Sequence, residues 1–424
     1  MSDTSWYQIA PAGWKRKKLK YLADFVGGGT PDKSKPEFWN GEIPWVSPKD
    51  MKTDEILDTE DHITSDGLHS SATNVVESGA ALIVVRSGIL RHSIPVAVNR
   101  VPVALNQDMR AILPHEPLEV EFLASLIRGF QTELLRQWSK EGATVESIEY
   151  DLMASTEIPL PPLDVQKRIV GYLERETADI DALIAAKQKL LDLMAEKRRA
   201  IAAEAVMRGL DPSAPLRSSG IDWLGDIPAH WEVERCRWLF TERDQRSQTG
   251  EEEMLTVSHL TGVTPRSEKD VNMFEAESTT GYKLCIAGDL AINTLWAWMG
   301  AMGTARVDGI VSPAYNVYTP GPRLLPDYVD ALVRIPVFAQ EVTRYSKGVW
   351  SSRLRLYPEG FFETWWPVPP LEEQQQIVEH ISAETTKIDR LRTATESSIA
   401  LLKERRAALI AAAVTGQLEI SEAA

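Results

Sequence analysis

The sequence predicts an α+β chain in which two mixed α/β modules are separated by two long antiparallel coiled-coil helices, with a pseudo-twofold relation between the halves. Residues 158–212 return at 366–420 in the same register, and each copy has a proline-rich start followed by about 45 residues of helical pattern. The segment before each copy contains short apolar runs bounded by turn residues. A period of 208 residues (366 − 158) far exceeds the roughly 20–50 residues of a solenoid unit. The chain is therefore predicted to be a tandem of two like halves.

The repeated segments are predicted to be long helices that begin after Pro159–Pro162 and Pro367–Pro370. About 45 residues at a rise of 1.5 Å would span roughly 65–70 Å, which is longer than a globular core requires. Apolar residues recur in steps of three and four, as in a coiled-coil seam with some polar positions such as Thr395. The apolar seam positions are Leu173, Ile180, Leu183, Leu190, Met194 and Ile201 in the first copy and Ile377, Ile381, Ile388, Leu391, Leu402 and Leu409 in the second. We expect the two helices to pack against each other; two independent core helices are the alternative, although their polar faces leave little for a core to cover.

The two segments that precede the helices are predicted to be mixed modules of strands, loops and helices. Pro11–Trp14 has an echo in Pro228–Trp231 that marks the start of each module. Helical patterns occupy 122–138 and 328–345, near the module ends. The predicted strands are 80–85, 95–98 and 101–105 in the first module and 255–257, 290–293 and 316–318 in the second. Trp14, Trp231, Trp365 and Trp366 are expected to be packing residues.

Composition limits the class of protein. The hydrophobic fraction of 43% and charged fraction of 25% are ordinary for a soluble protein, and no run of about 18 apolar residues predicts a membrane span. Two cysteines, Cys236 and Cys285, fit buried free thiols in a reducing cytoplasm. The net charge of −15 counts against a free-standing nucleic-acid binder, because phosphate neutralisation supplies most nonspecific affinity. If the chain binds DNA, its basic groups must gather on one face, or a partner must supply much of the backbone contact.

Catalytic motifs are not found in the sequence. Gly27–Thr30 lacks the lysine and the following helix of a phosphate-binding loop, and the seven histidines form no metal-binding pair. The segment Ser312–Tyr315 does not match the Asn/Asp-Pro-Pro-aromatic tetrad of a DNA methyltransferase. We therefore predict a non-catalytic protein without a metal site or a cofactor of its own.

Polar and aromatic loops in both modules are candidates for contact with DNA. Arg, Lys, Asn and Gln pair with purine edges in the major groove, and flexible glycines let backbone amides approach phosphates. In the first module the candidates are Lys33, Lys35, Lys49, Arg86, Ser87, Arg91, Asn106 and Gln107. In the second module they are Ser258, His259, Asn293, Trp296, Lys347, Trp350, Ser352 and Arg353. Each loop taken alone is also compatible with a surface turn or a core aromatic.

Several motifs together resemble a known family. They are Gly28–Pro31 and Ile43–Asp50 in the first module, the pattern Pro-x-Pro-Pro-Leu-x-x-Gln-x-x-Ile-Val at the start of both helices, and Glu404–Ile410 followed by Val414–Gly416. With these motifs the chain resembles, over essentially its full length, the specificity (S) subunit of Type I restriction-modification systems.

The resemblance implies two target-recognition domains, 1–157 and 213–365, each reading half of an asymmetric bipartite DNA sequence. Helical spacers at 158–212 and 366–424 would set the gap between the half-sites. Two modification (methyltransferase) subunits would bring S-adenosylmethionine, and two restriction subunits, where the host has them, would bring ATP and Mg. The implied partner-binding residues are Gln166, Ile169, Gln374, Ile377, Glu404 and Arg406. A coiled-coil interaction scaffold without a DNA role and an enzyme fused to a recognition domain are the rival hypotheses.

Overall fold

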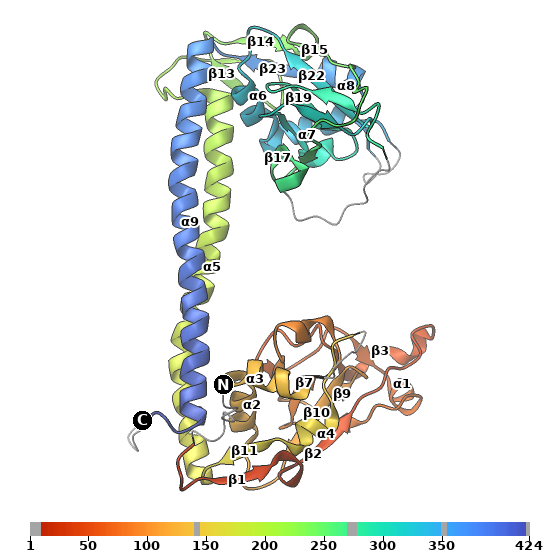
Figure 1. Ribbon diagram of the computed structural model, residues 1–424, viewed down its shortest axis with the longest axis vertical. Helices are drawn as coiled ribbons and strands as arrows, with labels where there is room; N and C mark the ends of the chain where they lie inside the picture. The colour runs from red at the N-terminus through yellow and green to blue at the C-terminus, as the bar shows by residue number, and fades with distance from the viewer. Residues whose placement is uncertain (1–9, 140–144, 269–277, 349–353, 421–424) are drawn as a thin grey trace. The chain divides into compact units, whose positions relative to one another are not determined.

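The computed structural model describes residues 10–139, 145–268, 278–348 and 354–420. The chain divides into two compact units, Met1–Lys187 with Ser397–Ala424 and Gln188–Glu396 (Figure 1). Each unit therefore contains one module together with one part of each long helix. The predicted division of the chain into two recognition domains and two helical spacers stays a prediction, because the compact units are divided within the long helices and the prediction divides the chain at the helix ends.

The described residues of the first unit's module form three sheets. Their strand orders are β2-β10-β7-β8-β4, β5-β3-β9-β6 and β1-β11. The strands are β1 (Lys15–Lys18), β2 (Ala23–Gly27), β3 (Trp39–Val46), β4 (Glu55–Ile56), β5 (His62–Ile63), β6 (Val75–Val76), β7 (Ala81–Val84), β8 (Val96–Asn99), β9 (Val103–Leu105), β10 (Met109–Pro114) and β11 (Glu157–Leu160). The helices are α1 (Ser65–His69), α2 (Val120–Gly129), α3 (Gln131–Trp138) and α4 (Tyr150–Ser155).

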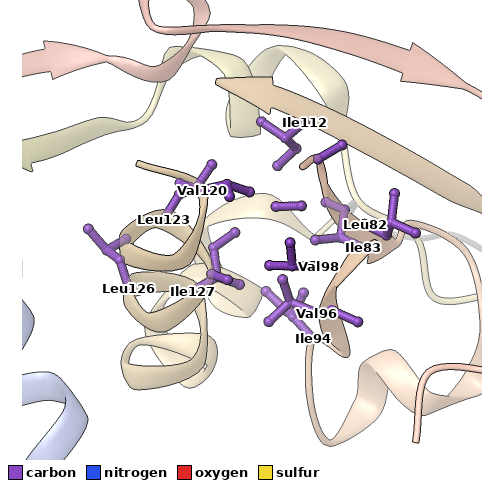
Figure 2. Close-up of a cluster of buried hydrophobic side chains, with 14 of the residues drawn as sticks. Leu82, Ile83, Ile94, Val96, Val98, Ile112, Val120, Leu123, Leu126 and Ile127 are labelled. Carbon is purple, nitrogen blue, oxygen red and sulfur yellow. The ribbon is translucent and has the colours of Figure 1, made fainter. Parts of the chain in front are cut away.

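The core of this module lies between α2 and the five-stranded sheet. Leu123 and Ile127 of α2 face Leu82, Val98 and Ile112 of the sheet (Figure 2). The strands form where β-branched and other apolar residues run together, and all four residues of β7 are buried. The predicted helical segment 122–138 is two helices, since the chain leaves helical geometry at Phe130.

The module of the second unit is built from smaller sheets. Their strand orders are β15-β22-β19-β20, β16-β17, β18-β21, β12-β13 and β14-β23. The strands are β12 (Leu216–Ser218), β13 (Asp226–Pro228), β14 (Glu232–Arg235), β15 (Phe240–Glu242), β16 (Leu255–Ser258), β17 (Gly262–Pro265), β18 (Lys283–Cys285), β19 (Leu290–Asn293), β20 (Met302–Thr304), β21 (Gly309–Val311), β22 (Tyr315–Pro320) and β23 (Trp365–Val368). The helices are α6 (Pro326–Val333), α7 (Pro336–Tyr345) and α8 (Pro358–Glu363).

Aromatic side chains dominate the core of the second module. Trp366 lies with its ring centroid 5.0 Å from that of Phe338 and 4.9 Å from that of Phe240, and both contacts are inclined as aromatic pairs prefer. Trp231 and Trp366 are buried, so their prediction as packing residues is confirmed. Pro336 starts α7, and it separates the predicted helix 328–345 into α6 and α7 because proline has no N–H for a continuing helix.

The two predicted long helices are present as α5 (Leu163–Arg208) and α9 (Leu371–Val414), which lie side by side in Figure 1. In the first unit Arg406 of α9 pairs with Asp181 of α5, with 2.8 Å between Nε and Oδ1. In the second unit Arg198 of α5 lies 3.7 Å from Asp389 of α9. Adding the repeat shift of 208 to Asp181 and Arg198 gives Asp389 and Arg406, so the same pair occurs once in each unit with the helices exchanged. The predicted antiparallel packing is confirmed within each unit.

The predicted phase of the coiled-coil seam is only partly correct. Ile388 is buried as expected, and so is the polar seam position Thr395. Leu183, Leu190 and Leu391 are instead exposed at 46%, 42% and 58%. An α-helix drifts by about 20° per heptad relative to a strict seven-residue repeat, so a seam counted from one end loses its phase along a helix of this length.

Each long helix ends on a glycine that packs against the start of a module. Gly209 follows α5 with φ +74°, and Gly416 follows α9 with φ +70°, the left-handed conformation that glycine adopts readily at helix ends. A Cβ on Gly416 would lie 2.8 Å from Pro11, and a Cβ on Gly209 would lie 3.2 Å from Trp231. The two Pro-Ala-x-Trp segments therefore play equivalent structural roles.

Candidate nucleic-acid interface

Candidate loops of the first module come together in the structure. Strands β3 and β9 pair in parallel, and the Asn106 backbone N–H donates to Val46 O over 2.9 Å. The Trp45 indole N–H donates to Gly29 O over 3.0 Å, and the Thr30 hydroxyl donates to the Gln107 side chain. The glycine-rich loop, the Ile43–Asp50 segment and the Asn106–Asp108 turn thus form one surface.

Gly28 is required for this convergence. A Cβ at this position would lie 2.2 Å from the carbonyl oxygens of Leu105 and Asn106, a separation that no side chain could occupy. The motif Gly28–Pro31 therefore reflects close backbone approach between two loops. This packing explains why the glycines occur there without a phosphate-binding helix behind them.

The remaining candidate loop of the first module, which follows β7, is attached to the same surface by charge. Arg86 Nε lies 2.6 Å from Asp108 Oδ1, and Arg91 Nε lies 3.2 Å from Glu146 Oε1. Both guanidinium groups are exposed, and exposed ion pairs contribute about 0–1 kcal/mol. These cations can therefore exchange their carboxylates for phosphates or base edges at small cost.

The lysines of this surface differ in how they are held. Lys49 Nζ lies 2.8 Å from Asp61, and the hydrogen bond to this carboxylate is the main reason that the pKa of Lys49 is raised. Lys33 and Lys35 are exposed, with the Lys35 ammonium 5.0 Å from the centre of the Phe38 ring. Lys33 and Lys35 are therefore positioned to meet an anionic ligand.

Two of the predicted DNA-contacting residues of the first module form hydrogen bonds within their own turns. Asn106 is 8% exposed, and its side-chain oxygen accepts from the Asp108 backbone N–H. Ser87 accepts from the Ile89 N–H at 3.4 Å. In this conformation Asn106 shapes the loop and has little surface to offer, and its contact with a base stays a prediction.

In the second module the structure brings together the segments at Asn293 and Lys347. Asn293 Nδ2 donates to the Tyr315 hydroxyl over 3.1 Å. The carbonyl of the next residue, Thr294, accepts from the Leu356 N–H. Trp296, two residues further along the chain, is 50% exposed. Lys347 is exposed and pairs with Arg355 through two backbone hydrogen bonds of 2.9 Å. Trp350, Ser352 and Arg353 lie outside the described residues.

Ser258 and His259 lie on a different element, the hairpin between β16 and β17. The Ser258 hydroxyl accepts from Leu260 N–H at 3.2 Å, and His259 is exposed. Gly262 closes the turn with φ +70°. The hairpin thus carries the His259 imidazole and the Ser258 hydroxyl, and neither group is part of the hydrophobic core.

The predicted partner-binding glutamines have an internal role. Gln166 donates to Pro117 O (2.7 Å) and Pro161 O (2.9 Å) and accepts from Glu119 N–H (2.9 Å). Gln374 repeats this network in the second unit, donating to Arg323 O (2.8 Å) and Pro369 O (2.9 Å) and accepting from Leu325 N–H (2.8 Å). Both glutamines are fully buried, as are their neighbours Ile169 and Ile377, so these four side chains lack the exposed atoms that direct contact with a partner requires.

The other two predicted partner-binding residues, on α9, differ from these. Glu404 is exposed, whereas Arg406 is held by Asp181 and by Asp54, whose carboxylate lies 3.3 Å from Nη2. Burial alone would lower the pKa of Arg406, but the hydrogen bonds and charges of the two carboxylates outweigh burial and raise it. Arg406 therefore joins the first module to both long helices.

One group of basic residues was missed by the sequence reasoning. All four residues of β1, Lys15–Lys18, are exposed, and Lys20 follows with its ammonium 5.2 Å from the ring centre of Tyr21, which is 69% exposed. The run of basic residues in the sequence could have revealed this cluster. It is not visible in a net charge that is summed over a whole module. This cluster adds exposed positive charge to an acidic chain.

The described residues contain no group of three His, Cys, Asp or Glu side chains that could hold a metal ion. Both cysteines are free and buried, and burial raises the pKa of Cys285 to about 12. Such a thiol stays protonated at neutral pH and is a poor nucleophile. Within the described part of the chain, no helix is long and apolar enough to cross a membrane.

Comparison with known proteins agrees with this geometry. Residues 11–192 match the family described as Type I restriction modification DNA specificity domain. The chain is 41% identical over 160 residues to the Type I restriction enzyme EcoR124I/EcoR124II specificity subunit of Escherichia coli, covering 38% of this chain and 40% of that protein. It is 28% identical over 235 residues to the MjaIX specificity subunit of Methanocaldococcus jannaschii, covering 53% of this chain and 51% of that protein. The matches thus span about half or less of these relatives.

A solved structure from work on complex assembly and conformational transition of the type I R-M system has the same fold. It superposes with a TM-score of 0.69 at 19% identity and covers 96% of this chain and 99% of that one. The shared architecture is that of two mixed α/β modules joined to long helices. The predicted resemblance is confirmed: residues 11–192 match the Type I restriction modification DNA specificity domain, and the fold is that of the solved structure.

Proposed function

We propose that this chain is the sequence-reading subunit of a Type I restriction-modification complex and has no catalytic activity of its own. The observation that carries the proposal is the convergence of separate loops on the first module, with Lys33, Arg86 and Gln107 exposed on one surface. Such residues contact phosphates and purine edges. The second module presents its own loops, so the two modules would read two different halves of an asymmetric bipartite target.

The proposal includes two modification subunits, which would supply S-adenosylmethionine and transfer the methyl group to adenine. Restriction subunits, where present, would supply ATP and Mg, and the complex would work in the cytoplasm. Two properties of the chain support the need for partners. Its net charge of −15 disfavours tight DNA binding alone, and the exposed leucines on α5 and α9 offer apolar surface for other helices. These leucines are Leu183, Leu190, Leu193, Leu391 and Leu401.

Mass photometry of the chain mixed with modification subunits tests the assembly. We expect a stable species that contains one copy of this chain and two modification subunits. A salt-titrated gel shift should show weak, poorly discriminating DNA binding by the chain alone and tight, specific binding by the complex.

Two outcomes would contradict the proposal. Failure to associate with any methylating partner would favour the coiled-coil scaffold, for which the uncovered leucines are the supporting observation. Tight specific binding by the isolated chain would show that the partners do not supply the missing positive charge.

A further inference from the structure

The two units can be aligned residue by residue through their shared hydrogen bonds. Gln166 caps α2 at Glu119 N–H, and Gln374 caps α6 at Leu325 N–H, so α2 and α6 correspond with a shift of 206 (325 − 119). The same shift places Arg334 at the position of Arg128 (128 + 206).

The two arginines make equivalent contacts. Arg128 Nη2 donates to Asp54 O over 3.1 Å, and Arg334 Nη2 donates to Leu260 O over 2.7 Å. Each guanidinium thus reaches the backbone of a loop in its own module. Asp54 and Leu260 therefore occupy equivalent positions in the two units.

At this position the two units differ in charge. In the first unit the Asp54 carboxylate lies 3.2 Å from Arg128 Nε and 3.3 Å from Arg406 Nη2. In the second unit Leu260 has no carboxylate to offer, and it is 72% exposed. Arg198, the repeat equivalent of Arg406, has a side chain that is 51% exposed, against 22% for Arg406. The second unit thus keeps the equivalent arginines but has no carboxylate at the position of Asp54, although Arg198 lies near Asp389 and Arg334 near Asp330.

A pocket of about 560 Å³ opens beside Leu260. Its basic lining residues are Arg198, Arg199, His259, Arg306 and Arg334. Two carboxylates also line it: Asp327, 3.5 Å from Arg306, and Asp330, 3.7 Å from Arg334. Burial raises the pKa of Asp330, and the Thr304 N–H donates to it, so this carboxylate is directed into the protein. Outside the pocket lining, Asp389 lies 3.7 Å from Arg198. Four arginines against these three carboxylates still leave an excess of one positive charge.

We propose that this pocket binds a phosphate of the DNA backbone, which takes the place that the Asp54 carboxylate takes in the first unit. The inference rests on the proposed DNA-reading function. Two features favour phosphate over a carboxylate from a partner protein. His259, on the hairpin predicted to contact DNA, lines the pocket. A phosphate also offers more acceptor oxygens to several guanidinium groups, each of which can bind it through two parallel hydrogen bonds.

Two independent substitutions test the site in the complex with modification subunits. Leu260→Asp supplies the carboxylate that the first unit already has, and Arg199→Gln removes one exposed charge. Both side chains are exposed, so both variants should fold, which thermal melting would check. Arg390→Gln, an exposed position on α9 in the same unit, is the matched control.

The readout is the salt dependence of affinity for a duplex that carries the target. For each variant we expect the slope of log K against log salt concentration to become shallower by about 0.9, the loss of one phosphate contact, with an affinity about fivefold lower at fixed salt. The control should match the wild type. A slope unchanged in both variants would overturn the phosphate site while leaving the proposed function intact.

A second measurement distinguishes a DNA phosphate from a carboxylate of a partner protein as the ligand of the pocket. If both variants weaken association with the modification subunits in the absence of DNA and leave the slope unchanged, the pocket holds a partner carboxylate and the proposal is wrong. Failure of the wild-type complex to bind its target specifically would remove the proposed function and the phosphate site together.

Discussion

At the scale of single residues, the buried glutamines at the helix starts have the clearest structural role. Gln166 and Gln374 each satisfy two carbonyl oxygens and one N–H that would otherwise be buried without partners. We expect Gln166→Ala or Gln374→Ala to lower the free energy of unfolding by about 2–4 kcal/mol, because an unsatisfied buried polar group costs about 1–3 kcal/mol. Urea denaturation measures this loss. Gln376→Ala, at an exposed position, should change stability by less than about 0.5 kcal/mol, and an equal loss in that control would contradict the assignment.

Asp330 gives the second unit a defined pH dependence. Burial raises the pKa of Asp330 above its unfolded value of 3.8, so the folded state holds this proton more tightly than the unfolded chain does. The contribution of Asp330 to stability is therefore most favourable below pH 3.8 and is lost as the pH rises through the raised pKa. Asp330→Asn should remove this component, so the stability of the variant relative to the wild type should be higher at pH 7 than at pH 4. A stability difference that does not change with pH in parallel urea titrations would contradict this.

At the scale of elements, the proposed function predicts that the loops determine which bases are read. The loop 86–91 is joined to the Asn106–Asp108 turn through Arg86 and Asp108, so it belongs to the proposed DNA-contacting surface of the first module. Exchanging this loop for that of a relative should change one half of the methylated sequence and leave the other half and the gap unchanged. Sequencing of methylated adenines measures all three. A changed gap would show that this loop acts on spacing.

Elements also show what the sequence could and could not predict. The long helices, most strands and the loops of the interface follow from local periodicity and turn chemistry. The role of Gln166 could not be predicted, because its partners, Pro117 and Glu119, lie 49 and 47 residues away. Asp54 is one acidic residue among many until the fold places it beside Arg406. Long-range pairing of this kind has no local pattern.

At the scale of the whole molecule, we expect α5 and α9 to fix the gap between the half-sites. One heptad adds about 10 Å to a helix, which corresponds to about three base pairs. Inserting one heptad in both helices, at positions that correspond in the repeat, should lengthen the gap and leave both half-sites recognisable. Deleting one heptad from each should shorten it. Altered half-sites with an unchanged gap would show that the helices do not set the spacing.

The most direct test of the central claim is single-molecule sequencing of methylated adenines in cells that express this chain with its modification subunits. Two modules that read independently predict one asymmetric target made of two short sequences with a gap of fixed length. A continuous or palindromic target, or methylation that does not depend on this chain, would contradict the account.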